Sequence, residues 1–246
     1  MTIVLVHGNP EVADVWSALA DELGRDDVVA LSPPGFGGVM PEGFGSTAPE
    51  YARWLVEEIT PLPDPIHLIG HDWGGGHVVT ATLLRPDLVT SVTTDIAGVF
   101  APGYEWHDMA EAWRTPGVGE EAVAAMASSP TEEWVERYVS LGMNRGAAEA
   151  CAARVGEMGP SILALYRSAD PSVLQRYGSD LAGLDPRPDV HVVIATADTF
   201  TGGEEKAMFT AKAWDATVHR LEGLGHWWMM EDPARAAAMV RDIVGD

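Results

Sequence analysis

The sequence predicts an α/β fold: a mostly parallel sheet flanked by helices, with an all-helical segment inserted. Short apolar runs alternate with helical patterns near both ends of the 246-residue chain, and this alternation is typical of βαβ units. The apolar runs are nearly continuous, as in parallel strands that are buried on both faces. The length and the 46% content of hydrophobic residues suit one domain with a substantial core.

Each element is expected from its local pattern. The segment Asp14–Leu23, for example, carries apolar residues at helical spacing. The other predicted helices are Tyr51–Ile59, Gly75–Leu84, Glu204–Trp214 and Pro233–Ile243. The predicted strands are Ile3–Val6, Val28–Leu31, Ile66–Ile69, Val89–Ile96, Val190–Thr196 and Thr217–Leu221.

Between residues 101 and 184 the strand pattern disappears and the composition is helical. We predict that residues 101–184 form a helical cap, and that residues 1–100 and 185–246 form the α/β core. Ligands of open α/β sheets bind beyond the carboxyl ends of the strands. A cap over those ends would enclose the ligand.

The charge balance argues against several kinds of partner. The chain has 15 Lys and Arg against 37 Asp and Glu, a net charge of −22, whereas nucleic acids and anionic membranes attract clustered basic residues. We interpret the acidity as a solvated surface. The single cysteine, Cys151, and the lack of a signal-peptide or membrane-spanning pattern predict a cytoplasmic protein. Nothing in the sequence indicates the oligomeric state.

The most informative window is Gly70-His71-Asp72-Trp73-Gly74, which lies between a predicted strand and a predicted helix. Its pattern Gly-x-Asp-x-Gly has the spacing of a nucleophile elbow, with Asp where Ser is usual. The glycines permit a sharp turn that lifts the central side chain above the sheet, beside a helix N-terminus that stabilises an anion. Taken alone, the motif fits a helix-capping Asp72 equally well.

A second segment, His7-Gly8-Asn9-Pro10, follows the first strand. It could direct a backbone N–H toward the elbow, so that Asn9 and Trp73 together form an oxyanion hole.

The last part of the chain supplies an acid and a base. Asp198 ends a predicted strand, and His226 follows the final one. The order nucleophile, acid, base is the one used by folds with this elbow. Asp95, at the end of Val89–Ile96, is an alternative acid. We favour Asp198 because its spacing to His226 is the common one.

These motifs resemble the α/β-hydrolase superfamily, and within it the epoxide hydrolases and haloalkane dehalogenases, which use an Asp nucleophile. The matching motifs are His-Gly-Asn-Pro at 7–10, Gly-His-Asp-Trp-Gly-Gly at 70–75, the strand end at Asp198, and Gly225-His226. The resemblance covers nearly the whole chain and implies an eight-stranded sheet with a helical cap. The usual first two strands are missing here, so we expect about six.

An Asp nucleophile predicts a particular chemistry. A carboxylate can displace a leaving group at saturated carbon and form an alkyl ester with the enzyme. His226, polarised by Asp198, can then deprotonate the water that hydrolyses the ester. The competing class is a non-catalytic binding protein of the same fold, and the complete set of Asp72, Asp198 and His226 argues against it.

Two leaving groups remain open. An epoxide oxygen needs a proton donor, and Leu165-Tyr166-Arg167 resembles the element that supplies a cap Tyr in epoxide hydrolases. A second donor could be His107 or Tyr138. A halide needs N–H donors, and Trp73 with Asn9 matches the dehalogenase pair. We favour the epoxide.

The substrate is expected to be small and apolar, with water as the second reactant. We predict that His7, Trp106, Trp227 and Tyr138 contact it. The Gly-rich stretch Gly35–Gly38 lacks the spacing of a dinucleotide fingerprint, and no His, Cys or carboxylate cluster has metal-ligand spacing. We therefore expect neither a cofactor nor a metal.

Overall fold

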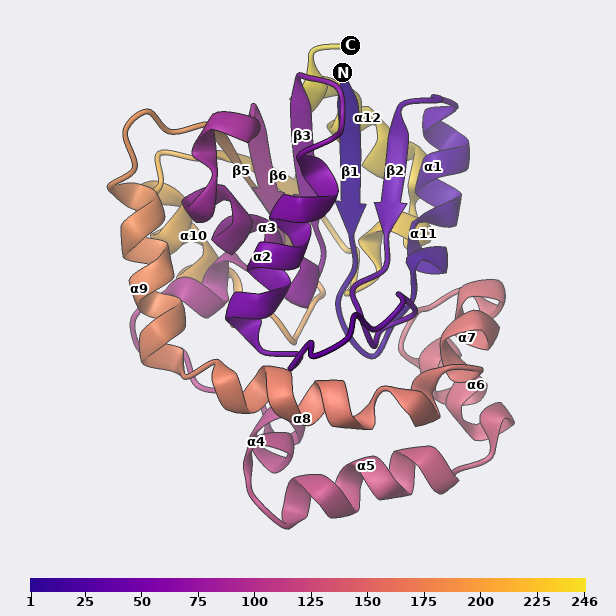
Figure 1. Ribbon diagram of the computed structural model, residues 1–246. Helices are drawn as coiled ribbons and strands as arrows, with labels where there is room; N and C mark the ends of the chain where they lie inside the picture. The colour runs from indigo at the N-terminus through magenta and orange to yellow at the C-terminus, as the bar shows by residue number, and fades with distance from the viewer.

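The computed structural model describes residues 1–246 and contains one six-stranded sheet in the order β2-β1-β3-β4-β5-β6 (Figure 1). All neighbouring strands are parallel. The predicted α/β fold with a mostly parallel sheet of about six strands is therefore confirmed. The strands are β1 (Thr2–Val6), β2 (Val28–Leu31), β3 (Ile66–Gly70), β4 (Ser91–Thr94), β5 (Asp189–Ala195) and β6 (Thr217–Leu221).

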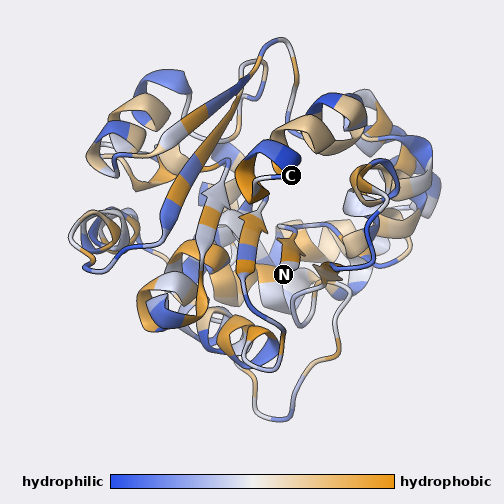
Figure 2. Ribbon diagram, turned by 90° about the horizontal axis from the view of Figure 1, so that it is seen from above, coloured by the Kyte–Doolittle hydropathy of each residue, from blue (hydrophilic) through white to orange (hydrophobic).

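Helices cover both faces of the sheet. In Figure 1, α2 and α3 lie in front of it, and α12 lies behind it with α1 packed alongside. This double cover buries β1 and β3 along their whole length, and Figure 2 shows apolar residues running through the central strands. These helices are α1 (Ser17–Leu23), α2 (Ala48–Ile59), α3 (Trp73–Leu84), α10 (Glu204–Ala213), α11 (Trp228–Glu231) and α12 (Pro233–Val244).

Six helices lie between β4 and β5 in the chain. In Figure 1, α4 to α8 lie beyond the carboxyl ends of the strands, whereas α9 runs beside the sheet and packs against α3. The division into a core and a cap at residues 101 and 184 stays a prediction. The six helices are α4 (Asp108–Arg114), α5 (Val118–Ser128), α6 (Thr131–Ser140), α7 (Arg145–Ala152), α8 (Gly159–Ser168) and α9 (Pro171–Ala182).

A few boundaries differ from the prediction, for local reasons. Helix α2 begins at Ala48, three residues early, because Thr47 and Glu50 form a capping box ahead of it. Strand β4 spans only Ser91–Thr94, because Val89 ends a 3-10 turn. The short helix α11 was not predicted. No helix combines the length and the apolar character that crossing a bilayer requires.

Candidate active site

Asp72 occupies a sharp turn between β3 and α3. Its φ of 48° lies in the left-handed region, which costs energy for residues other than glycine. Two glycines make the turn possible: a Cβ on Gly70 would lie 2.4 Å from the Gly74 carbonyl oxygen, and one on Gly74 would lie 2.0 Å from the Val6 carbonyl oxygen. The elbow geometry inferred from Gly-x-Asp-x-Gly is thus present.

Two backbone N–H groups face the Asp72 carboxylate. Asn9 N donates to Asp72 Oδ1 at 3.0 Å, and the backbone N–H of Trp73 lies close enough to the carboxylate to lower its pKa. Burial raises the pKa of Asp72 to about 6, although the nearby His226 works against the rise. The structure thus brings together the two residues predicted to form an oxyanion hole.

His226 is paired with Asp198. The distance from His226 Nδ1 to Asp198 Oδ2 is 2.8 Å, and Phe200 N donates to the other Asp198 oxygen at 2.7 Å. Burial alone would lower the pKa of His226, but the charge and hydrogen bond of Asp198, together with the Asp72 charge, outweigh it, and the net shift is upward. With its Nδ1–H donated to Asp198, neutral His226 keeps Nε2 free to accept a proton.

Asp95, the alternative acid, is engaged elsewhere. Its Oδ2 lies 2.5 Å from His71 Nδ1 and accepts the Trp228 indole N–H at 2.8 Å. Its Oδ1 accepts the backbone N–H of Asp72 at 3.0 Å. These contacts make Asp95 a support for the elbow, and they leave Asp198 as the carboxylate that holds His226.

Sequence reasoning missed the buried partners of Asp95. His71 lies between two carboxylates, with its Nε2 3.2 Å from Glu11 Oε1. Glu11 also accepts the Trp227 indole N–H at 2.6 Å and the Gly8 N–H at 3.2 Å. We call these three side chains the Glu11–His71–Asp95 network. Glu11 follows the His-Gly-Asn-Pro loop directly, but no local pattern marks it among 37 acidic residues.

The Glu11–His71–Asp95 network carries a buried positive charge on His71. Burial opposes this charge, yet Asp95 and Glu11 raise the pKa of His71 well above its usual value. Burial likewise opposes ionisation of Glu11, but His71 lowers its pKa to about 2. Through Gly8, Asp72 and the two tryptophans after His226, the network ties together the loops that carry the oxyanion donors, the nucleophile and the base.

One cluster meets the spacing of metal ligands. Ligand atoms of Glu11, His71 and His226 lie within 4.8 Å of one another. Both ring nitrogens of His71 already face carboxylates, so we assign this cluster to hydrogen bonding.

We predict that changing Asp198 to Asn impairs turnover, whereas changing Asp95 to Asn impairs stability. Asp198→Asn should slow turnover by about 10²- to 10⁴-fold, because His226 loses its orientation and its counter-charge. Asp95→Asn should mainly destabilise the fold, by about 3 kcal/mol, because it leaves a buried charge partly unpaired. Steady-state turnover and urea unfolding of both variants separate the two roles. A large loss of turnover in stable Asp95→Asn, with Asp198→Asn active, would reverse our assignment.

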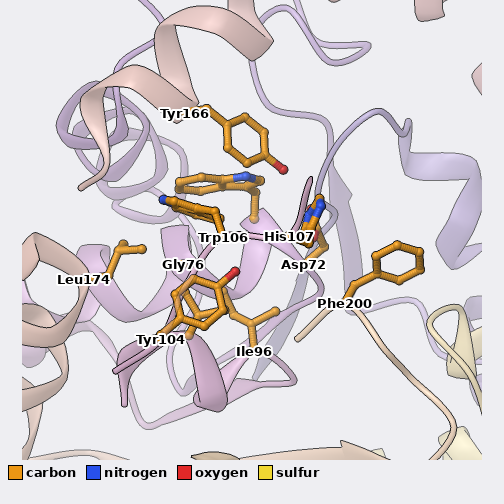
Figure 3. Close-up of a pocket in the computed structure, with 11 residues that line it drawn as sticks. Asp72, Gly76, Ile96, Tyr104, Trp106, His107, Tyr166, Leu174 and Phe200 are labelled. Atoms are coloured by element: carbon orange, nitrogen blue, oxygen red, sulfur yellow. The ribbon is translucent and has the colours of Figure 1, made fainter. Parts of the chain in front are cut away.

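The cavity beside Asp72 has two lobes, of about 20 and 80 Å³. Both lobes are lined by Asp72, His107, Tyr166 and Phe200. Figure 3 shows the smaller lobe, in which Tyr104 and Tyr166 direct their hydroxyl groups inward from opposite sides. Trp106 lines the smaller lobe, and Trp227 and Tyr138 line the larger one.

His7 does not contact this cavity, contrary to the prediction. Its ring is completely buried, with Nδ1 2.8 Å from the Gly8 carbonyl oxygen and Nε2 3.2 Å from Ser32 Oγ. Burial lowers the pKa of His7 to about 4. A neutral ring held between two loops supports the shape of the site and leaves substrate contact to other residues.

The predicted proton donors fall into different environments. Tyr138 donates its hydroxyl to the Pro10 carbonyl oxygen at 2.6 Å and is therefore engaged. Tyr166 is buried against the side chains of Trp73 and Asn9 and near the Asp72 charge; burial raises its pKa well above the usual value. Tyr104, which sequence reasoning missed, also faces the cavity, and burial followed by the Asp72 charge raises its pKa.

His107 caps helix α4. Its Nδ1 accepts the Ala110 N–H at 3.3 Å, and burial lowers its pKa. The ring is therefore neutral, and because Nδ1 accepts, its proton resides on Nε2. A neutral ring with an Nε2–H beside Asp72 can donate a hydrogen bond (Figure 3).

We compared the sequence and the fold with those of known proteins. No curated protein matches the sequence. The fold is similar to 2-hydroxy-6-oxo-6-phenylhexa-2,4-dienoate hydrolase from Rhodococcus sp. strain RHA1 (20% identity, 100% of this chain and 90% of that one, TM-score 0.76). It is also similar to haloalkane dehalogenase DbeA from Bradyrhizobium elkani USDA94 (19% identity, 99% of this chain and 90% of that one, TM-score 0.72). A third similar structure is the N-formylmaleamic acid deformylase of Pseudomonas putida S16 (15% identity, 97% of this chain and 91% of that one, TM-score 0.73).

At these identities the structural likeness shows the fold alone. The sequence itself matches the profile of the alpha/beta hydrolase family over residues 3–239. That match covers nearly the whole chain, including the elbow, Asp198 and His226, and so the chain belongs to the alpha/beta hydrolase family.

Proposed function

We propose that the protein is a hydrolase that acts through a covalent ester on Asp72 and converts a small epoxide to a vicinal diol. The observation that carries this proposal is Asp72 itself: a carboxylate stands at the elbow and faces the cavity beside the His226–Asp198 pair. No serine is available there, so the acyl chemistry of a serine esterase has no nucleophile.

The reaction divides into two steps. In the first, an Asp72 oxygen attacks an epoxide carbon, the C–O bond breaks, and the freed oxygen takes a proton from a cavity donor. In the second, His226 Nε2 removes a proton from water, and the resulting hydroxide attacks the Asp72 ester carbonyl. The N–H groups of Asn9 and Trp73 hold the tetrahedral oxyanion. Collapse releases the diol, whose second oxygen takes the proton from His226. The proton left on the Asp72 carboxyl returns to the cavity donor, which restores the starting enzyme.

The proton donors in the cavity support epoxide hydrolysis. The Tyr166 ring packs edge-on against Trp73, with 5.2 Å between the ring centroids, and it lies near Asn9. A phenol oxygen therefore stands close to the place where a halide would meet Trp73 and Asn9. The Tyr166 hydroxyl faces the cavity and can direct its proton at an epoxide oxygen. Tyr104 or His107 would supply the second donor.

One observation favours the alternative, halide displacement. The Asn9 side-chain amide is buried, and neither its nitrogen nor its oxygen has a hydrogen-bond partner. An unpaired buried N–H is costly, and a halide could accept it.

Two substrates decide between these reactions. Wild-type protein is given 1,2-epoxyhexane or 1-bromohexane, and diol and bromide are measured. Diol without bromide supports the proposal. Bromide without diol supports the alternative, and the absence of both products would exclude the two reactions for these substrates.

We predict that Tyr166→Phe slows epoxide opening by about 10²-fold, the lower range for a proton donor. Hydrolysis of the Asp72 ester should keep its rate, because Tyr166 takes no part in it. Rapid-quench kinetics separate the two steps, and Tyr177→Phe, which lies outside the cavity, is the matched control. Equal opening rates in wild type and Tyr166→Phe would remove Tyr166 from the mechanism.

A further inference from the structure

Arg137 is the only cationic side chain other than histidine that lines the larger lobe of the cavity. It lies on α6, is exposed to solvent, and shares the lobe with Asp72 and His226. The whole molecule carries a net charge of −22, which repels anions from the surface. The Arg137 guanidinium is therefore a local positive charge at the cavity of a strongly negative protein.

Helix α6 fixes where Arg137 lies. The Trp134 indole donates to the Met126 carbonyl oxygen at 3.2 Å, and the Arg137 guanidinium lies 5.1 Å from the Trp134 ring centroid. The next residue, Tyr138, donates to the Pro10 carbonyl oxygen at 2.6 Å, which anchors α6 to the oxyanion loop. The stacking and the anchor hold the cation on the cavity side of the helix.

Arg137 also lacks the ion pair that its sequence offers. Glu133 lies four residues earlier on α6, the favourable arrangement for a helical ion pair, yet Arg137 makes no ion pair. On the adjacent helix α7, Arg145 pairs with Glu132, Glu136 and Glu149. The donors of Arg137 are thus left for a ligand, and its planar fork suits a carboxylate.

We propose that Arg137 binds a carboxylate at the end of the substrate remote from the reacting carbon, so that the substrates are small organic acids with an apolar body. This inference rests on the proposed function, because it concerns the same cavity. Apolar walls at Met109, Trp113 and Leu141 would contact the body of the substrate.

The test uses a matched pair of substrates. In 5,6-epoxyhexanoate a carboxylate replaces the terminal methyl group of 1,2-epoxyhexane. We expect wild type to prefer the acid, and Arg137→Gln to lower the ratio of kcat/KM for acid over neutral epoxide about fivefold to tenfold. Arg137→Lys should retain part of the preference, and Arg145→Gln all of it. An unchanged ratio in Arg137→Gln, with both epoxides still converted to diols, would overturn the inference and leave the proposed function standing.

A binding measurement keeps the inference testable if neither epoxide reacts. Binding of hexanoate can be measured by the change in tryptophan fluorescence. We expect hexanoate to bind Arg137→Gln about fivefold to tenfold more weakly than wild type. Arg145→Gln should bind it as wild type does. Equal affinities for hexanoate in wild type and Arg137→Gln would mean that Arg137 only packs on Trp134, and the inference would fail.

Discussion

Asp72→Asn is expected to lose catalysis by about 10⁴- to 10⁶-fold, the range found when the nucleophile of a catalytic set is removed. Asn keeps the shape of Asp and tolerates the left-handed φ of 48° at the elbow. The backbone N–H of Asn9 retains an acceptor oxygen, so the change removes the charge and little else. Product formation measured over hours gives the rate, and near-normal turnover would exclude a covalent ester on Asp72.

The same substitution is expected to stabilise the protein at neutral pH. The pKa of Asp72 rises from 3.8 to about 6 on folding. Between these values the folded state binds the proton more tightly than the unfolded state does, so the stabilisation from this group is complete below pH 3.8 and is lost as the pH rises through 6. An Asn at position 72 has no charge to bury, so it does not lose this stabilisation as the pH rises. The stability gain of Asp72→Asn should therefore grow between pH 4 and 7, to at most about 3 kcal/mol.

Urea unfolding at a series of pH values measures this gain. Asp21→Asn, at an exposed position on α1, serves as a control for the loss of one negative charge. A stability gain that is independent of pH would mean that ionised Asp72 does not destabilise the folded protein. It would then weaken the assignment of Asp72 as a buried, ionised nucleophile.

His226→Gln is expected to stop the reaction after its first step. Ester formation needs only the Asp72 carboxylate and a proton donor, whereas ester hydrolysis needs the base, whose removal costs about 10²- to 10⁴-fold. One equivalent of epoxide should be consumed in a burst, and the protein should gain the mass of the whole epoxide, because the opened oxygen stays on the ester. Digestion should place the added mass on the peptide that contains Asp72.

A matched histidine provides the control for this trapping experiment. His219 lies on β6 and contacts His191, at 3.0 Å between ring nitrogens, and it does not line the cavity. His219→Gln should turn over normally and accumulate no adduct. If His226→Gln instead showed no burst and no adduct with any substrate that wild type converts, the covalent mechanism would be wrong.

Local patterns in the sequence predicted most of the fold and the centre of the site. Buried parallel strands read as apolar runs, and the Gly-x-Asp-x-Gly turn needs its glycines because backbone atoms lie within 2.4 Å of the Cβ positions. Such signals occupy a few consecutive residues. Asp72, Asp198 and His226 could be named because each follows a predicted strand, and parallel strand ends meet at one edge of the sheet.

The missed residues carry no local signal. Glu11 lies 84 positions before Asp95 and meets it only through His71, so nothing in the neighbourhood of Glu11 distinguishes it from surface acids. Tyr104 lies in a loop whose direction depends on how the helices after β4 pack, and that packing involves residues far along the chain. His7 shows the opposite case: its place next to the Asn9 loop predicts substrate contact, but its ring is completely buried against Gly8 and Ser32.

The origin of the site's parts suggests how new specificities could evolve in this fold. The proposed nucleophile, base, acid and oxyanion donors all come from strand ends. The Glu11–His71–Asp95 network joins the loops that carry the nucleophile, the base and the oxyanion donors. The other cavity-lining residues to which we assign a role all come from the segment between β4 and β5: Tyr104, His107, Arg137 and Tyr166. Exchanging that single segment would change the leaving group or the substrate and leave the ester-hydrolysing machinery in place.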